Sequence, residues 1–129
     1  MSIWTHLTGL VRLDALVGII PMTAKPFDIF ATNIPMGSEG PAHIQFNEYP
    51  VKEIANDPRY GFVAIWGDLR DYSDEQKIQE WFRASLSKTA NSGFMIRSAI
   101  LLVEVEGRST VMFRYDPESG KVSIEREGI

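Results

Sequence analysis

The sequence contains no cysteine among its 129 residues. This absence excludes a disulfide framework, thiolate metal ligands and a cysteine nucleophile, and it is compatible with a reducing compartment. Long hydrophobic runs are lacking as well. The apolar start of the chain is interrupted by Arg12 and Asp14, and no basic leader precedes it. We therefore expect neither a signal peptide nor a membrane span, and we expect a cytoplasmic protein.

Basic charge is also scarce. The chain has 13 Lys and Arg against 17 Asp and Glu, for a formal net charge of -4. A protein that binds long nucleic acid usually has a basic face, and no segment here clusters lysine or arginine. One or two well-placed arginines suffice for a phosphate or a carboxylate. The composition therefore disfavours long nucleic acid as a partner and leaves a small anionic molecule open.

Motifs of the common enzyme classes are missing too. The chain has no G-x-S-x-G, no G-x-G-x-x-G and no G-x-x-x-x-G-K-[ST] pattern. Its histidines, His6 and His43, form no HxH or HxxxH pair, and a metal site would need at least one further carboxylate beside them. We therefore predict no catalytic residue, no metal site and no cofactor.

The chain does have a well-marked strand that leads into an amphipathic helix, over residues 60–91. In the strand, Val63, Ile65 and Leu69 point to one side because successive side chains alternate. To the other side point Phe62, Ala64, Trp66, Asp68 and Arg70. A sheet covered by helices on one side needs only one apolar face. The second face therefore requires a ligand, a partner subunit or another layer of the chain.

The helix is predicted from its start signal and its apolar stripe. Ser73 and Gln76 have the spacing of a capping box, which predicts Ser73 as the N-cap. Ile78, Trp81 and Phe82 recur at helical spacing and are expected to pack on the sheet.

Alternating residues predict further strands at 3–13, 42–49, 95–106, 109–115 and 121–127. Residues 14–41 are a long connection with several prolines, in which a short helix at 27–33 is open, and residues 51–59 have room for a helical turn. The order predicts one α+β domain over residues 1–129, with a mainly antiparallel sheet and one well-defined helix. It resembles a ferredoxin-like βαββαβ arrangement with an extra C-terminal hairpin. An antiparallel sheet wrapped around the helix is the alternative.

The side of the predicted sheet that faces away from the helix contains aromatic and polar residues. It holds Trp4, His6, Arg12, His43, Gln45, Asn47, Tyr49, Phe62, Trp66, Asp68, Arg70, Met112 and Arg114. Rings interleaved with hydrogen-bonding groups bind flat polar molecules, and the same residue types are enriched at subunit interfaces. Trp66 with Arg70 or Arg12 would suit a base and a phosphate. The candidate ligand-binding residues are Trp4, His6, Arg12, Trp66, Asp68 and Arg70.

The densest polar cluster is IWGDLRDY, residues 65–72. Asp68 and Asp71 could supply the two carboxylates of an acid–base pair, which needs two groups with separated pKa values. Arg70 could bind an anion. An ion pair at the strand end, followed by the helix cap, explains the same residues without chemistry, and this interpretation is favoured.

Three phrases, WTHLTGLVRLD, MGSEGP and IWGDLRDY, resemble phrases in small uncharacterised proteins encoded by bacteriophages. The resemblance spans most of the chain. It implies an accessory protein in the cytoplasm of an infected bacterium that binds a host protein or sequesters a small signalling molecule, and it assigns no catalytic residue.

We therefore expect a non-enzymatic module, a homo-oligomer, that binds a nucleotide-like or other anionic small molecule on the Trp66 face. The alternative is a protein-interaction or assembly protein that uses this face as an oligomer or partner interface. An enzyme that uses Asp68 or His6 ranks lowest.

Overall fold

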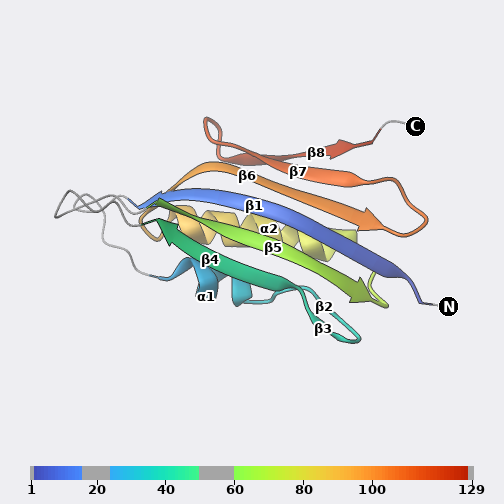
Figure 1. Cartoon of the computed structure of the whole chain (residues 1–129). Helices are drawn as coiled ribbons and strands as arrows, with labels where there is room; N and C mark the ends of the chain where they lie inside the picture. The colour runs from blue at the N-terminus through green and yellow to red at the C-terminus, as the bar shows by residue number, and fades with distance from the viewer. Residues whose placement is uncertain (1, 16–23, 50–59, 128–129) are drawn as a thin grey trace.

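A computed structural model of the chain describes residues 2–15, 24–49 and 60–127. Within these ranges the chain forms eight strands and two helices (Figure 1). The helices are α1 (Pro26–Ala31) and α2 (Glu75–Ala90). The strands are β1 (Trp4–Ala15), β2 (Met36–Gly37), β3 (Gly40–Pro41), β4 (His43–Tyr49), β5 (Tyr60–Arg70), β6 (Phe94–Val105), β7 (Val111–Asp116) and β8 (Lys121–Arg126).

Six of the described strands form one sheet in the order β4-β5-β1-β6-β7-β8. Every neighbouring pair in it is antiparallel. The first strand, β1, lies in the middle of the sheet, between β5 and β6, and β2 and β3 form a separate small hairpin. The predicted α+β class with a mainly antiparallel sheet is confirmed. The prediction of one helix is too low, because α1 forms within the connection where the sequence left a short helix open.

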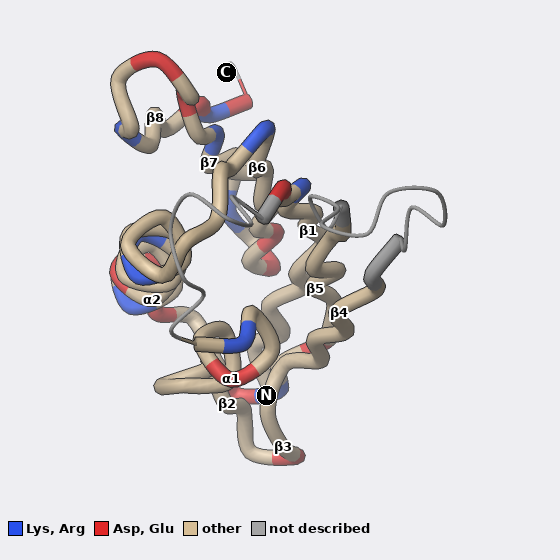
Figure 2. The backbone as a smooth tube through the Cα atoms, turned by 90° about the vertical axis from the view of Figure 1, so that its left-hand side faces the viewer, with Lys and Arg blue, Asp and Glu red and all other residues tan. Residues whose placement is uncertain are grey.

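Both described helices lie on the same side of the sheet, as the view along its edge shows (Figure 2). The strands alternate their side chains between the two sides. Leu7 and Val11 of β1 are therefore buried beneath the helices, while Thr8 and Leu10 point away. We call the side away from the helices the open face. Among the described residues, no helix or strand lies over it.

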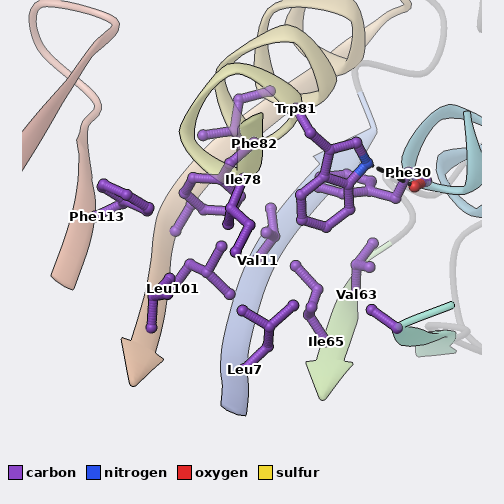
Figure 3. Close-up of a cluster of buried hydrophobic side chains, with 14 of the residues drawn as sticks. Leu7, Val11, Phe30, Val63, Ile65, Ile78, Trp81, Phe82, Leu101 and Phe113 are labelled. Carbon is purple, nitrogen blue, oxygen red and sulfur yellow. Dashed lines mark hydrogen bonds between the residues drawn. The ribbon is translucent and has the colours of Figure 1, made fainter. Parts of the chain in front are cut away.

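The core lies between α2 and the sheet (Figure 3). The predicted helix stripe is confirmed, since Ile78, Trp81 and Phe82 are all buried. Trp81 packs edge-on against Phe30 of α1, with ring centroids 6.0 Å apart, and its Nε1–H donates to the Phe30 carbonyl oxygen at 3.0 Å. Fully burying such a side chain stabilises the fold by about 1.5–3 kcal/mol. This contact fixes α1 against α2.

The start of α2 differs from the prediction. The N-cap is Asp74, whose carboxylate accepts the Lys77 backbone N–H at 3.1 Å, so the predicted capping box of Ser73 and Gln76 is wrong. Gln76 instead donates to the Glu80 carboxylate at 3.3 Å. Aspartate caps a helix as well as serine does, and its charge also suits the positive end of the helix dipole. The two candidate N-caps, Ser73 and Asp74, are adjacent in the sequence.

The last two strands curl toward α2. Arg83 of the helix donates to the Val122 carbonyl oxygen at 3.1 Å, and Arg126 of β8 pairs with Glu75 at 2.5 Å. The helical turn predicted within residues 51–59 lies outside the described residues, as do residues 16–23 of the long connection. In the described part of the chain, no helix is long and apolar enough to cross a membrane.

Candidate functional site

The structure places all six candidate residues on one face, the open face. Trp4, His6 and Arg12 are alternate residues of β1, and the other three candidates alternate along β5. The antiparallel register sets Trp4 opposite Arg70 and His6 opposite Asp68. Their binding of a ligand stays a prediction, but their common orientation follows directly from the pairing of the two strands.

An apolar band crosses the middle of the open face. The register aligns Trp66, Thr8, Leu102 and Met112 in one row across four strands, and Ala64, Leu10 and Ile100 in the next. We define the apolar band as Ala64, Trp66, Leu10, Ile100, Leu102 and Met112. Trp66 is 43% exposed and Leu10 is 40% exposed. The centre of this face is therefore apolar and in contact with solvent.

Trp66 has a partner on the edge strand. His43 of β4 stacks on its indole, with ring centroids 5.6 Å apart and planes inclined by 21°. Arg70 lies four residues from Trp66 along β5, and Arg12 lies four residues from Thr8, the residue opposite Trp66. Four residues of strand span roughly 13 Å. The structure therefore does not bring Trp66 together with either arginine, and a base on Trp66 would have no adjacent anion anchor.

Carboxylates gather where β1 begins. The Nδ1 atom of His6 lies 2.5 Å from an Asp68 carboxylate oxygen, and its Nε2 atom lies 3.9 Å from a Glu106 oxygen. Glu104 is opposite His6 on β6. We call Asp68, Glu104 and Glu106 the acidic end of the open face.

The His6 imidazole is oriented, but it has no reaction partner in the described part of the chain. Its hydrogen bonds and ion pairs there are to carboxylates alone. A nucleophilic site needs a hydroxyl or thiol within hydrogen-bond reach of such a base. No group of three or more potential metal ligands occurs among the described residues either.

Arg70 ties the end of β5 to two other segments. Its Nε–H donates to the Ser2 hydroxyl at 3.0 Å, its guanidinium lies 6.0 Å from the centre of the Trp4 ring, and Glu39 approaches it at 3.9 Å. Cation–π and exposed ion-pair contacts of this kind contribute modestly each. Together they explain Arg70 as a structural clamp, in agreement with the strand-end ion pair favoured from the sequence.

The phrase MGSEGP forms the β2–β3 hairpin, which lies beside the end of β5 at the same corner of the sheet. The Ser38 hydroxyl donates to the Asp71 carboxylate at 2.8 Å, and the Ser38 N–H donates to the Arg70 carbonyl oxygen at 2.9 Å. A Cβ atom on Gly37 would lie 2.7 Å from the Arg70 backbone, so only glycine fits there. All three phrases behind the bacteriophage resemblance thus meet at one corner of the sheet.

Positive charge lies at the opposite end of β1. A hollow of about 860 Å³ opens there on the open face, lined by Leu10, Arg12, Leu13, Asp14, Gly61, Phe62, Arg97 and Ser98. Arg97 pairs with Asp14. We call Arg12 and Arg97 the basic end of the open face.

Arg97 and Glu104 were not predicted from the sequence as members of this surface. In the register, Arg12 pairs with Ser98 while Leu13 pairs with Ile96, so Arg97 is the extra residue of a β-bulge in β6. A bulge redirects the side chain of the extra residue. Strand alternation cannot predict such a shift, because the bulge depends on pairing with β1.

Comparison of the chain with protein-family models, with curated proteins and with solved structures found no match. Trp4, His6, Asp68 and Arg70 lie together at or beside the acidic end, Trp66 lies in the apolar band, and Arg12 lies at the basic end.

Proposed function

We propose that this protein is a non-enzymatic interaction module that binds another polypeptide through the open face of its sheet. The observation that supports this most is the apolar band, which the described helices and strands leave uncovered. A sheet with one solvated face normally presents polar residues on it. A contiguous apolar patch on a protein surface instead usually marks a contact site.

The dimensions of the open face favour a polypeptide over a small molecule. The band crosses β5, β1, β6 and β7, and four strands span roughly 19 Å at the usual strand spacing. Ligand pockets are concave and bury most of their ligand. The hollow at Arg12 lies at the end of the band, so the band itself offers a broad surface.

The residue types also suit a protein contact. Tryptophan, methionine and arginine are enriched at interfaces, and the open face holds Trp66, Met112 and Arg12. Charged residues lie at both ends of the band, which matches an apolar centre with a polar rim.

A photoreactive probe tests this proposal. Thr8 is exposed in the middle of the open face, and Ser87 is exposed on α2, on the other side of the sheet. We expect benzoylphenylalanine at position 8 to form covalent adducts with a polypeptide in bacterial cells that produce the protein, and the same probe at position 87 to form few. Equal adduct formation at both positions, or none at position 8, would contradict the proposal.

A second candidate function is the sequestration of a small anionic, nucleotide-like molecule at the basic end. The hollow there combines the Phe62 ring with the Arg12 and Arg97 guanidinium groups. Rings and arginines together bind a base and a phosphate. Native mass spectrometry of gently purified protein would then show an added small mass, which Arg12→Gln removes and the remote Lys121→Gln retains. Identical spectra without added mass would exclude this candidate.

The fold of the module is proposed to be an extended ferredoxin-like arrangement. Without β7 and β8 the strand order is β4-β5-β1-β6, α1 follows β1, and α2 follows β5, which supports a βαββαβ pattern. The β2–β3 hairpin before β4 and the C-terminal β7–β8 hairpin are additions to it.

The setting is proposed to be the cytoplasm of a bacterium infected by a bacteriophage. The three phrases that resemble bacteriophage-encoded proteins support this origin, and the absence of cysteine is compatible with a reducing compartment.

A further inference from the structure

We infer that the polypeptide on the open face is a second copy of this chain, packed face to face with its strands running in the opposite direction. This inference rests on the proposed function and adds the partner and the arrangement. Three observations support it: the separation of charge along β1, the equal spacing of His6 and Arg12 about Gly9, and the breadth of the open face.

Charge is separated along the direction of β1. The acidic end carries Asp68, Glu104 and Glu106, and the basic end carries Arg12 and Arg97.

Among the described residues, charges of the other sign at each end are already paired. At the acidic end, Arg70 is held by Ser2, Glu39 and the Trp4 ring. At the basic end, Asp14 pairs with Arg97, and farther across the sheet Arg114 pairs with Glu125 at 3.4 Å. Among the described residues, the acidic end thus keeps an excess of negative charge, and at the basic end Asp14 offsets Arg97 and leaves the positive charge of Arg12 in excess.

Symmetry then selects one arrangement. Two identical faces pack around a two-fold axis that lies in the plane between them. An axis parallel to the strands would set the acidic end on the partner's acidic end. An axis across the strands reverses the strand direction and sets the acidic end on the partner's basic end. Like charges brought together at an interface are costly, so the second arrangement is favoured.

We place this axis at the level of Gly9, midway between the acidic end and the basic end of β1. His6 and Arg12 lie three residues to either side of Gly9, and on β6 Glu104 and Ser98 lie three residues to either side of Leu101, which pairs with Gly9. An axis across the strands at this level sets His6 over the partner's Arg12 and sets Glu104 over the partner's Ser98. The Trp66 row then lies over the partner's Leu10 row, so the two apolar bands cover each other.

The breadth of the open face suits a second sheet. At the usual strand spacing and rise, the face from β4 to β7 and from His6 to Arg12 measures about 24 Å by about 23 Å. The product is a flat area of about 550 Å², which is close to the roughly 600 Å² per partner at the lower end of specific interfaces. A single helix is only about 10–12 Å wide and would leave much of the band exposed.

Sedimentation equilibrium of the purified protein tests the partner. We expect a monomer–dimer equilibrium that Leu10→Glu weakens by about tenfold or more, because the added carboxylate would be buried between two apolar bands. Ile124→Glu is the matched control, since Ile124 is 43% exposed on β8 but points to the helix side. Circular dichroism checks that both variants fold. A monomer at every concentration, or equal effects of the two variants, would overturn the inference.

Single cysteines test the arrangement in a chain that has none of its own. Ser98→Cys and Glu104→Cys are both exposed positions on β6. We expect a short bismaleimide to link the two variants to each other when they are mixed, because they face each other across about 10 Å of sheet spacing. Each variant alone places its cysteines roughly 22 Å apart in the dimer, from the strand rise and the sheet spacing. Efficient linking within each variant alone would contradict the reversed strands.

The results separate this inference from the function on which it rests. A monomer whose Thr8 probe captures a different polypeptide refutes the second copy and keeps the interaction module. A monomer whose Thr8 probe captures no polypeptide refutes both. A dimer that Leu10→Glu dissociates supports both.

Discussion

At the scale of single residues, Trp66 and Trp81 show how similar side chains take opposite roles. Trp81 is buried and donates to the Phe30 carbonyl oxygen, whereas Trp66 is exposed and stacks on His43. Trp81→Phe would leave that carbonyl oxygen unsatisfied, and we expect it to lower the free energy of unfolding by about 1–3 kcal/mol. Urea denaturation measures the loss. Trp66→Phe is the control and should change stability by less than about 0.5 kcal/mol.

Tyr72 links stability to alkaline pH. Burial raises the pKa of its hydroxyl above the usual 10.0, and the negative charge of Asp74 raises this pKa further. The unfolded chain therefore ionises first, and the contribution of Tyr72 to stability is complete below pH 10 and is lost as pH rises through its pKa in the folded state. The difference in unfolding free energy between the wild type and Tyr72→Phe should shift in favour of the variant above pH 10. A difference that is constant with pH would contradict the raised pKa.

Residue types were easier to predict from the sequence than residue partners. Arg70 was singled out as an anion anchor or as half of a strand-end ion pair. Its contacts are with Ser2, Trp4 and Glu39, which come from other segments of the chain. Spacing along one strand carries no information about such contacts, because they depend on how β1 pairs with β5 and on how the β2–β3 hairpin closes on β5.

At the scale of elements, the start of α2 gives a direct comparison between two candidate caps. The Asp74 carboxylate accepts the Lys77 N–H, while the Ser73 side chain makes no capping bond to the helix. We expect Asp74→Ala to lower the free energy of unfolding by about 0.5–2 kcal/mol. Ser73→Ala should cost clearly less. Thermal or urea unfolding of the two variants measures this, and the reverse order would restore the capping box as the true start of the helix.

The helix α2 and the six strands of the large sheet were predicted well, whereas a short helix near α1 was only left open and the two-residue strands β2 and β3 were not predicted. The stripe of α2 and the alternation of β5, β6 and β7 are strong periodic signals, and the structure differs from them by only a few residues at the ends. The six residues of α1 are too few for a periodic signal. That helix is stabilised by packing of Phe30 against Trp81, a tertiary contact that the sequence does not reveal.

At the scale of the whole molecule, the open face was predicted in outline from the sequence. Two-sided apolar alternation in β1 and β5 indicated that a second face needed a cover, and the structure leaves that face without one among the described elements. The strand order could not be predicted in the same way. It is the order that brings Glu104 beside His6 and Ser98 beside Arg12, and so separates acidic from basic charge along the sheet.

Hydroxyl-radical footprinting at low and at high protein concentration tests most directly whether the open face is covered by a second copy. We expect oxidation of Trp66 and Met112, both in the apolar band, to fall several-fold as concentration rises. Met36, which is 60% exposed on the β2–β3 hairpin, should react equally at both concentrations. Unchanged oxidation of Trp66 and Met112 would contradict coverage of the open face by a second copy, and so would a fall of equal size at Met36.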